Sequence, residues 1–223
     1  MVAVDVIEIS KRFRSAGRTV DALDGFSMRA DSGELVALVG PSGTGKTTLL
    51  RILGCQLAPD RGRVLVDGRA LPRPGSSAGA RFRSREVGFV FQELGLVEEE
   101  TAVANVALPL RYAGVAARPA LRRAEALLAE VGLADLAGTP VATLSTGQRQ
   151  RVAIARAQAN DPGLILADEA TSNLDQDNTA DVLGLLRGLA GRGATVVLAT
   201  HDEQAWRACD RVVTLPPHKN SHP

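Results

Sequence analysis

The sequence lacks the features that mark several common classes of protein. Lys and Arg number 26 against 25 Asp and Glu, and a formal net charge of +1 gives no strong field toward nucleic acid or anionic lipid. Two cysteines, Cys55 and Cys209, are too few for a disulfide framework or a thiolate metal site. We expect both to pack as small apolar side chains in a reducing compartment. Only 3% of the residues are aromatic.

Long apolar runs are also missing. Crossing a bilayer takes roughly 18 to 20 apolar residues, whereas the longest runs here, 35–39 and 195–199, have the length of buried strands. The N-terminus alternates Val2, Val4 and Val6 with other residues and has no positively charged region, which predicts a strand rather than a signal peptide. We therefore expect one cytoplasmic domain, large enough to bury a core.

Periodicity and turn residues predict an α/β protein. Strands are expected around 2–9, 26–28, 35–39, 64–66, 87–91, 164–167, 195–200 and 211–215. Helices are expected around 49–53, within 100–140, and over 147–159 and 182–189. The alternation predicts a mostly parallel sheet with right-handed crossovers, and the early hairpins predict a small antiparallel part. Residues 71–85 are expected to form an exposed loop and 216–223 a disordered tail.

A glycine-rich segment directly follows the apolar run 35–39. Residues 40–47 match G-x-x-x-x-G-K-[ST] and lead into an expected helix. The glycines let backbone N–H groups turn inward as a nest for anions, and the helix N-terminus adds partial positive charge. In this motif Lys46 reaches the terminal phosphates and Thr47 ligates Mg²⁺. The predicted nucleoside triphosphate site comprises Gly40, Pro41, Ser42, Gly43, Thr44, Gly45, Lys46, Thr47 and Thr48.

Two acidic residues end a later apolar strand. Asp168 and Glu169 follow 164–167 at its carboxyl end, where ligands gather in open α/β sheets. Asp168 can hold Mg²⁺ through its water shell. Glu169, beside the γ-phosphate, can polarise the attacking water, and a positioned general base contributes typically ~10²–10⁴-fold to rate. The pair predicts hydrolysis rather than binding alone.

A third motif, Leu144-Ser145-Thr146-Gly147-Gln148, precedes the expected helix 147–159. It resembles the LSGGQ signature of the nucleotide-binding subunits of ATP-binding-cassette (ABC) transporters, and the resemblance extends over nearly all of the chain. It implies a P-loop core over about 1–92 and 160–215, a helical subdomain over about 93–159 and a short tail over 216–223. In that family the signature of one subunit meets the γ-phosphate held by the other. Without the resemblance, Ser145 is simply an expected helix N-cap.

Thr146 departs from the family pattern, since it stands at the first glycine of the signature. If this position needs a positive φ, a β-branched residue there is strained by about 1–3 kcal/mol. We expect weakened ATP-driven closure at worst, and not inactivity.

The resemblance gives roles to four further residues. Gln92 resembles the Q-loop glutamine, which contacts Mg²⁺ or water, and His201 resembles the switch histidine, which orients Glu169. Asp175, in Ser172-Asn173-Leu174-Asp175, resembles the D-loop residue that communicates across the dimer. Phe13 is expected to stack on adenine. Taken alone, each is weak evidence: a polar strand end, an ordinary histidine or a core phenylalanine would look the same.

The resemblance implies an ATPase that binds ATP and Mg²⁺ and works as a homodimer or heterodimer of cassettes. It implies a place on the inner face of the cell membrane, where the ATPase drives a separate integral permease. Residues 92–110 are similar to the branch that serves lipoprotein release and macrolide export.

Two alternatives stay open: a regulatory cassette of the cell-division type, and a small nucleotide kinase, which would leave 145–148 unexplained. No nucleic-acid partner is expected, because the five arginines within 69–85 lack interleaved aromatics other than Phe82.

Overall fold

The computed structural model describes residues 2–15, 18–172 and 174–217. The strands are β1 (Val2–Ser15), β2 (Arg18–Asp31), β3 (Leu35–Val39), β4 (Arg61–Val66), β5 (Arg69–Ala70), β6 (Val87–Val90), β7 (Leu164–Asp168), β8 (Thr195–Ala199) and β9 (Arg211–Thr214). The helices are α1 (Lys46–Leu53), α2 (Ser77–Arg85), α3 (Ala102–Tyr112), α4 (Ala117–Glu130), α5 (Thr146–Ala157), α6 (Gln176–Gly191) and α7 (Glu203–Arg207). Short 3₁₀ turns at Ala134–Leu136 and Val141–Thr143 lead into α5.

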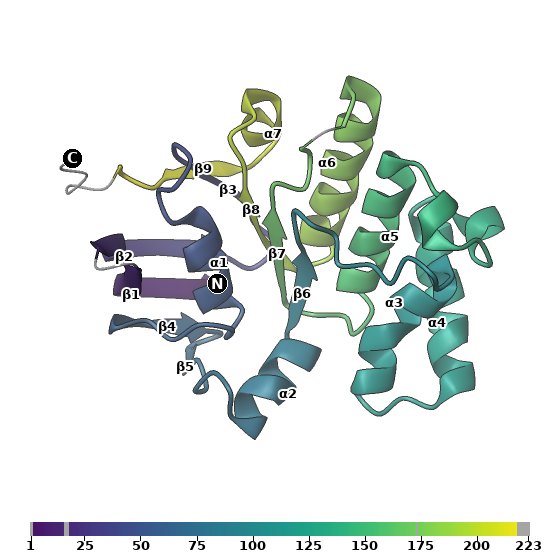
Figure 1. The fold of residues 1–223 in the computed structure, drawn as a ribbon, viewed down its shortest axis with the longest axis horizontal. Coiled ribbons are helices and arrows are strands. Elements are labelled where there is room, and N and C mark those ends of the chain that lie inside the picture. Colours follow the sequence, from purple (N-terminus) through teal and green to yellow (C-terminus); the bar gives the residue numbers. More distant parts are fainter. Residues whose placement is uncertain (1, 16–17, 173, 218–223) are drawn as a thin grey trace.

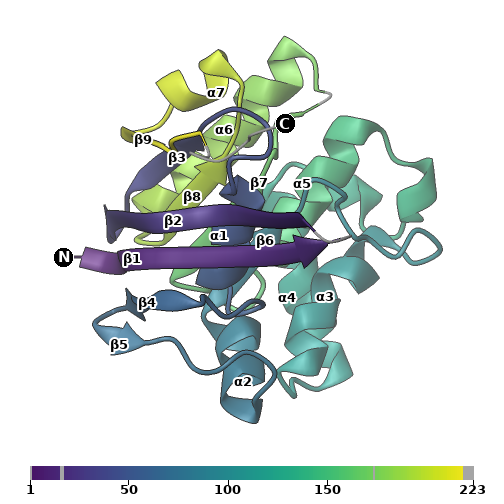
Figure 2. The ribbon, with the colours of Figure 1, turned by 60° about the vertical axis from the view of Figure 1, so that its left-hand side comes forward.

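Two sheets organise the chain. One is parallel in the order β6-β7-β8-β3-β9, and the other is antiparallel in the order β2-β1-β4-β5. The antiparallel sheet lies on one side of the parallel sheet and α3 to α5 lie on the other (Figure 1). Figure 2 shows β1 and β2 passing in front of α1. The α/β fold with a mostly parallel sheet and a small antiparallel part, predicted from the sequence, is confirmed.

The central strands are apolar because helices and the second sheet cover both of their faces. All five residues of β3 are buried. On one face Leu49 and Ile52 of α1 pack into a core shared with β1, β2 and β4. On the other face Ile154 of α5 and Leu186 of α6 pack into a second core. Each fully buried Leu or Ile contributes about 1.5–3 kcal/mol to the stability of the fold relative to exposure. Burial of these side chains therefore fixes α1 and α5 on opposite faces of the sheet.

The helices α3, α4 and α5 enclose a third core, which includes Leu127, Leu128 and Val152. The fully buried Asn105 of α3 anchors the preceding segment: its Oδ1 accepts from Val97 N at 2.8 Å, and its Nδ2 donates to Val97 O at 2.9 Å. This polar side chain therefore fixes the path between β6 and α3. The boundaries expected for a helical subdomain at 93 and 159 stay a prediction.

The expected exposed loop over 71–85 is wrong for its second half, which forms α2 (Ser77–Arg85). Ser76 caps this helix by accepting from Gly79 N at 3.0 Å, and Phe82 packs against the main core. Gly79 is buried, and a Cβ there would lie 3.2 Å from Cys55 Sγ. The arginine-rich composition did not indicate this helix, whose inward-facing positions are the small Gly79 and the apolar Phe82.

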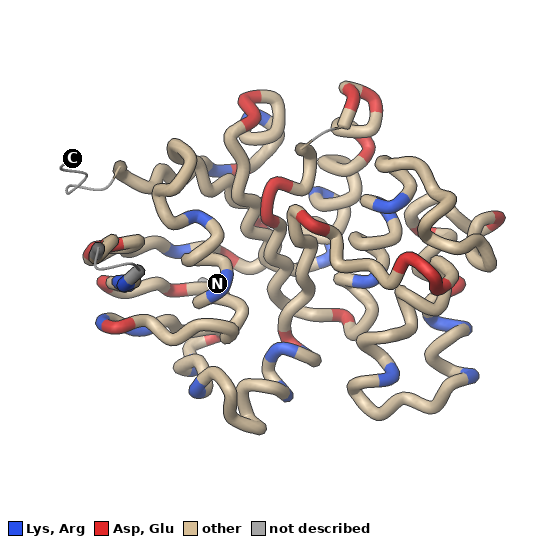
Figure 3. The backbone as a smooth tube through the Cα atoms, viewed as in Figure 1, with Lys and Arg blue, Asp and Glu red and all other residues tan. Residues whose placement is uncertain are grey.

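Both cysteines pack as expected. Cys55 is buried and Cys209 is half-buried, and burial raises the pKa of the Cys209 thiol to about 11. Figure 3 shows acidic and basic residues spread along the whole trace, in keeping with the balanced charge. No helix within the described ranges is long and apolar enough to cross a bilayer. Most of the tail expected to be disordered, 218–223, lies outside the described residues.

Candidate active site

Parallel pairing brings the predicted residues to one edge of the sheet. Val90 of β6 pairs with Ala167 of β7, and Asp168 pairs with Ala199 of β8. The chain therefore leaves β6, β7, β8 and β3 on the same side, as ligand sites in open α/β sheets require. The segments that leave this edge contain Gly40, Gln92, Glu169 and His201.

The loop between β3 and α1 has the conformation of an anion nest. Gly43 has φ 81° and Gly45 has φ 95°, and a Cβ on Gly45 would lie only 2.1 Å from Ala22 O. Lys46 Nζ donates to Gly40 O at 2.6 Å and to Pro41 O at 3.2 Å. These bonds place the Lys46 amine at the mouth of the loop, where it can donate charge-assisted hydrogen bonds to an anion.

The N-terminus of α1 faces the same loop without a side-chain cap. Gly45 stands at the N-cap position, and the first turn contains no acidic residue. Its first N–H groups are therefore available to an anion, and the helix dipole favours one there. The loop, the lysine and the helix end together fit the phosphates of a nucleotide.

Asp168 and Thr47 carry the oxygen atoms that the sequence predicts for a cation site, and they are hydrogen-bonded to each other. Burial raises the pKa of the Asp168 carboxyl and the Glu169 charge raises it further, whereas the Thr47 hydrogen bond and Lys46 lower it. A half-buried carboxylate beside a second carboxylate is stabilised by a hard divalent cation, and carboxylate and hydroxyl oxygens suit Mg²⁺. These two residues fit the predicted Mg²⁺ site.

Glu169 is held by three partners in an uncommon backbone conformation. Its φ is 51°, and its N–H donates to Ala199 O at 2.9 Å. His201 Nδ1 lies 3.0 Å from Oε1 and 2.8 Å from Oε2, and Ser172 Oγ donates to Oε2 at 3.1 Å. The Glu169 side chain is 13% exposed and that of His201 is 72% exposed. The pairing of Glu169 with His201 leaves the histidine open to a ligand.

Ser172 carried no sequence signal for contacting Glu169 beyond its place in the D-loop motif. The structural role of Asn105 was not predictable either, because spacing along a helix does not distinguish a fully buried asparagine from one on the surface. Both contacts are local, with sequence separations of 3 and 8 residues, but they depend on side-chain directions that only the folded chain shows.

The other predicted residues lie on β1, directly after β6 and directly before α6. Phe13 on β1 is 41% exposed, and Lys11 Nζ lies 5.7 Å from its ring centroid. Gln92 is exposed and makes no hydrogen bond within the described part of the chain. Asp175 caps α6 by accepting from Asn178 N at 2.8 Å. Asn173, which precedes it in the D-loop motif, lies outside the described residues.

The signature segment opens α5 with a complete capping box. Ser145 Oγ accepts from Gln148 N at 3.3 Å, and Gln148 Oε1 accepts from Ser145 N at 2.9 Å. Thr146 is exposed, begins the helix and is absent from the residues of positive φ. The condition for strain at Thr146, a positive φ, is therefore not met, since the first helical position uses ordinary negative φ that a threonine adopts freely.

A glycine nest after a central parallel strand, with an acidic pair at the end of the strand two places away, defines a P-loop nucleoside triphosphatase. The family model for ABC transporters matches residues 23–172, and the chain belongs to this family.

The relatives differ in what their names state. An uncharacterized ABC transporter ATP-binding protein of Thermotoga maritima is 46% identical over 89% of this chain and 85% of its own length. The methionine import ATP-binding protein MetN of Thermobifida fusca is 44% identical over 95% of this chain and 66% of its own length. The macrolide export ATP-binding/permease protein MacB of Burkholderia pseudomallei is 42% identical over 95% of this chain and 32% of its own length. The chain thus spans less than two thirds of the last two.

A solved structure gives the catalytic class. The dimeric post-hydrolysis state of the ATP-binding cassette MJ0796, bound to ADP and Pi, superposes with a TM-score of 0.88 at 34% identity, over 97% of each chain. This chain is an ABC-type ATP-binding subunit and an ATPase.

Proposed function

We propose that two cassettes close face to face on two ATP molecules, each adding its signature to the other's phosphate loop. The observation that carries this proposal is the arrangement around the sheet. The phosphate loop enters α1, which packs on one face, whereas the signature opens α5, which packs on the other face. A second cassette gives the Ser145 to Gln148 segment a nucleotide to contact. The dimeric MJ0796 structure supports this arrangement.

Within each site the chain's own residues divide the work. Lys46 and the loop amides bind the phosphates, and Phe13 stacks on adenine. Glu169 accepts a proton from the attacking water, while His201 and Ser172 hold the carboxylate at the distances found here. When bound, Mg²⁺ neutralises phosphate charge, and Thr47, Asp168 and Gln92 are the residues proposed to hold it. Asp175 faces the partner cassette.

The closing step is tested with Glu169→Gln, which keeps the shape of the side chain and removes the base. Sedimentation velocity with saturating Mg-ATP should show a dimer, and the same protein with ADP should sediment as a monomer. The matched control is the double variant Glu169→Gln, Lys46→Ala, which should stay monomeric in ATP. Monomers of Glu169→Gln at saturating ATP would overturn the proposal.

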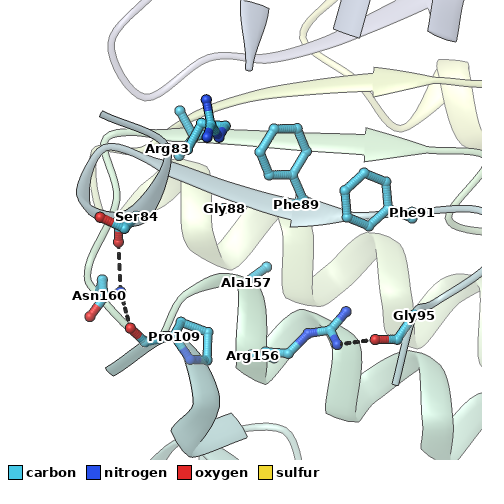
Figure 4. Close-up of a pocket in the computed structure, with 11 residues that line it drawn as sticks. Arg83, Ser84, Gly88, Phe89, Phe91, Gly95, Pro109, Arg156, Ala157 and Asn160 are labelled. Carbon is cyan, nitrogen blue, oxygen red and sulfur yellow. Dashed lines mark hydrogen bonds between the residues drawn. The ribbon is translucent and has the colours of Figure 1, made fainter. Parts of the chain in front are cut away.

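We further propose that a helix of a membrane permease docks in a groove between β6 and the helices α3 and α5. The groove has a volume of about 260 Å³, and its lining includes Phe89, Phe91, Pro109 and Ala157 (Figure 4). Phe89 and Phe91 stack with ring centroids 5.0 Å apart, and Phe91 is 37% exposed. An apolar groove with a stacked aromatic wall suits the apolar face of an amphipathic helix.

Two polar side chains of the groove already donate hydrogen bonds within the chain, which lowers the cost of covering them. Asn160 Nδ2 donates to Ser84 O at 2.7 Å and to Pro109 O at 3.2 Å. Arg156 donates to Leu94 O at 2.5 Å and to Gly95 O at 2.6 Å (Figure 4). Arg156 also belongs to α5, the helix that begins at the signature, so a push on 94–95 is passed to α5.

We propose an export- or extrusion-type permease as the partner, with the chain on the inner face of the cell membrane. The support is the macrolide exporter, which is 42% identical over 95% of this chain. The methionine importer matches the same share of the chain at 44%, so we assign the direction of transport to the permease.

Capture from detergent-solubilised membranes of the source cells tests the docking. The chain should recover a polytopic permease, and Phe91→Asp should abolish this recovery because it places a charge in the apolar wall. The matched control is Tyr112→Asp, since Tyr112 is 81% exposed and is absent from the groove lining. Equal recovery by Phe91→Asp and the wild type would contradict the proposed groove.

A further inference from the structure

The first turns of α5 and α6 lie against each other at Gly147 and Asn178. Gly147 is buried although it lies in the first turn of α5, next to the exposed Thr146. A Cβ built on Gly147 would lie 2.2 Å from Asn178 Oδ1 and 2.7 Å from its Cγ. Real Cβ atoms do not approach other atoms so closely, so an alanine at 147 forces the asparagine to move.

Asn178 is not free to move, because Asp175 holds it. Its Nδ2 donates to Asp175 Oδ1 at 2.9 Å and to Oδ2 at 2.8 Å, and its backbone N–H donates to Oδ1 at 2.8 Å. These bonds lower the pKa of Asp175 and keep its carboxylate charged and fixed at the start of α6. Displacing the Asn178 side chain therefore breaks both hydrogen bonds from Nδ2 to the Asp175 carboxylate.

We infer that Asn178 is a positioning residue that joins Gly147 of the signature to Asp175 of the D-loop, so that both reach the partner cassette as one rigid surface. This inference deepens the proposed function and rests on it. It also explains why the signature here accepts a threonine at 146 and keeps its glycine at 147. Thr146 points to solvent, whereas the space beside Gly147 is filled by Asn178.

A double-mutant cycle tests whether glycine is needed at 147 because of the contact with Asn178. The main alternative is that the glycine is needed only for close approach of the partner's nucleotide. The four proteins carry Glu169→Gln with no further change, Gly147→Ala, Asn178→Ala, or both. Dimer formation is titrated with Mg-ATP, and binding of ADP to the monomer is measured in parallel. Gln176→Ala, an exposed change in the same turn of α6, is the matched control.

We expect Gly147→Ala to raise the ATP concentration for half-maximal dimer by about tenfold, a size typical of coupled neighbours. Asn178→Ala should raise it several-fold, because Asp175 loses both side-chain bonds. Adding Gly147→Ala to Asn178→Ala should cost less than about twofold more, because the alanine at 178 leaves room for the new Cβ. ADP binding should change in none of the variants, since neither residue lies in the phosphate loop.

Equal damage by Gly147→Ala in both backgrounds would overturn the inference and assign the glycine to the partner's nucleotide. Thermal unfolding of each variant identifies any protein that fails to fold, and Asn178→Ser then replaces Asn178→Ala in the cycle. The proposed function fails separately, if the protein that carries Glu169→Gln alone does not dimerise in ATP.

Discussion

Carboxylates at the two ends of the parallel sheet have pKa values shifted in opposite directions. At the amino end, Glu34 precedes β3 and is paired with Arg211 of β9, with Nε 2.7 Å from Oε1. This hydrogen bond lowers the pKa of Glu34. At the carboxyl end, burial and the neighbouring Glu169 raise the pKa of Asp168. The fold therefore stabilises the charged form of Glu34 and destabilises the charged form of Asp168.

The difference separates structural from functional charge. Glu34 has a guanidinium beside it and also accepts from Asp31 N at 2.8 Å, so its charge is fully compensated within the chain. The Thr47 hydrogen bond and the charges of Lys46 and Arg51 compensate Asp168 in part, yet its pKa is still raised, which suits the proposed role of holding a cation that arrives with the nucleotide. Active sites commonly carry such incompletely compensated groups, and the rest of the fold offsets their cost.

The largest effect is expected from Glu169→Gln at the carboxyl end. ATP turnover should fall by about 10²- to 10⁴-fold, because an amide cannot accept the proton of the attacking water. ATP binding should persist, since Glu169 contacts His201 and Ser172 and not the phosphate loop. Phosphate release under saturating Mg-ATP measures the first, and equilibrium binding measures the second. Undiminished turnover would remove Glu169 from the proposed role.

Lys46→Ala should weaken ATP and ADP binding by about 10- to 150-fold, which corresponds to the loss of a charge-assisted hydrogen bond of about 1.5–3 kcal/mol. Lys46 is the ammonium held by the carbonyls of Gly40 and Pro41. Titration calorimetry gives the affinities, with the exposed Arg118→Ala as the control for a general loss of positive charge. Equal effects of the two variants would show that Lys46 acts only through net charge.

The carboxyl end was predictable in detail because its residues are contiguous in the chain. Gly40 to Thr48 and the pair Asp168 and Glu169 each follow an apolar strand, so one-dimensional spacing already implied a common edge. The contacts that orient these groups were not predictable. Ser172 on Glu169, Asn178 beside Gly147 and Asn105 under residue 97 depend on side-chain directions that appear only in the folded chain.

Two expectations from the sequence differ from the structure. The Pro, Gly and Arg content of 71–85 indicated a loop, yet Ser76 and Phe82 supply a cap and an apolar anchor for α2. At Thr146 strain was expected if the position needs a positive φ, and this condition is not met because the helix already begins there. At α2 the start of a helix was the missing information, and Ser76 was its local sign. At Ser145 the expected N-cap is present, and the helix begins one residue earlier than expected, at Thr146.

Asp168→Asn tests the cost of the functional carboxylate. An acid whose folded pKa is raised destabilises the fold at pH values above that pKa, and this penalty disappears as the pH falls below the unfolded value of 3.8. The variant without nucleotide should therefore be more stable at pH 7 by about 0.5–2 kcal/mol, the usual size of such gains. Urea denaturation measures the difference, which should shrink toward pH 4. A less stable variant at pH 7 would show that the Asp168 charge is compensated after all.

The smallest effect is expected at Glu34, with the opposite sign. Because its folded pKa is lowered, the pair with Arg211 stabilises the fold above the unfolded value of 4.5, and this contribution is lost as the pH falls through the folded pKa. Glu34→Gln should cost no more than about 1 kcal/mol at pH 7, since Arg211 is partly exposed, and should cost nothing at the acid end. Melting curves from pH 7 to pH 3 test this, and Arg211→Gln should remove most of the same pH dependence, because the bond from Asp31 N remains. If Glu34→Gln and the wild type lose stability in parallel, the amino end carries no compensated charge and the contrast with Asp168 disappears.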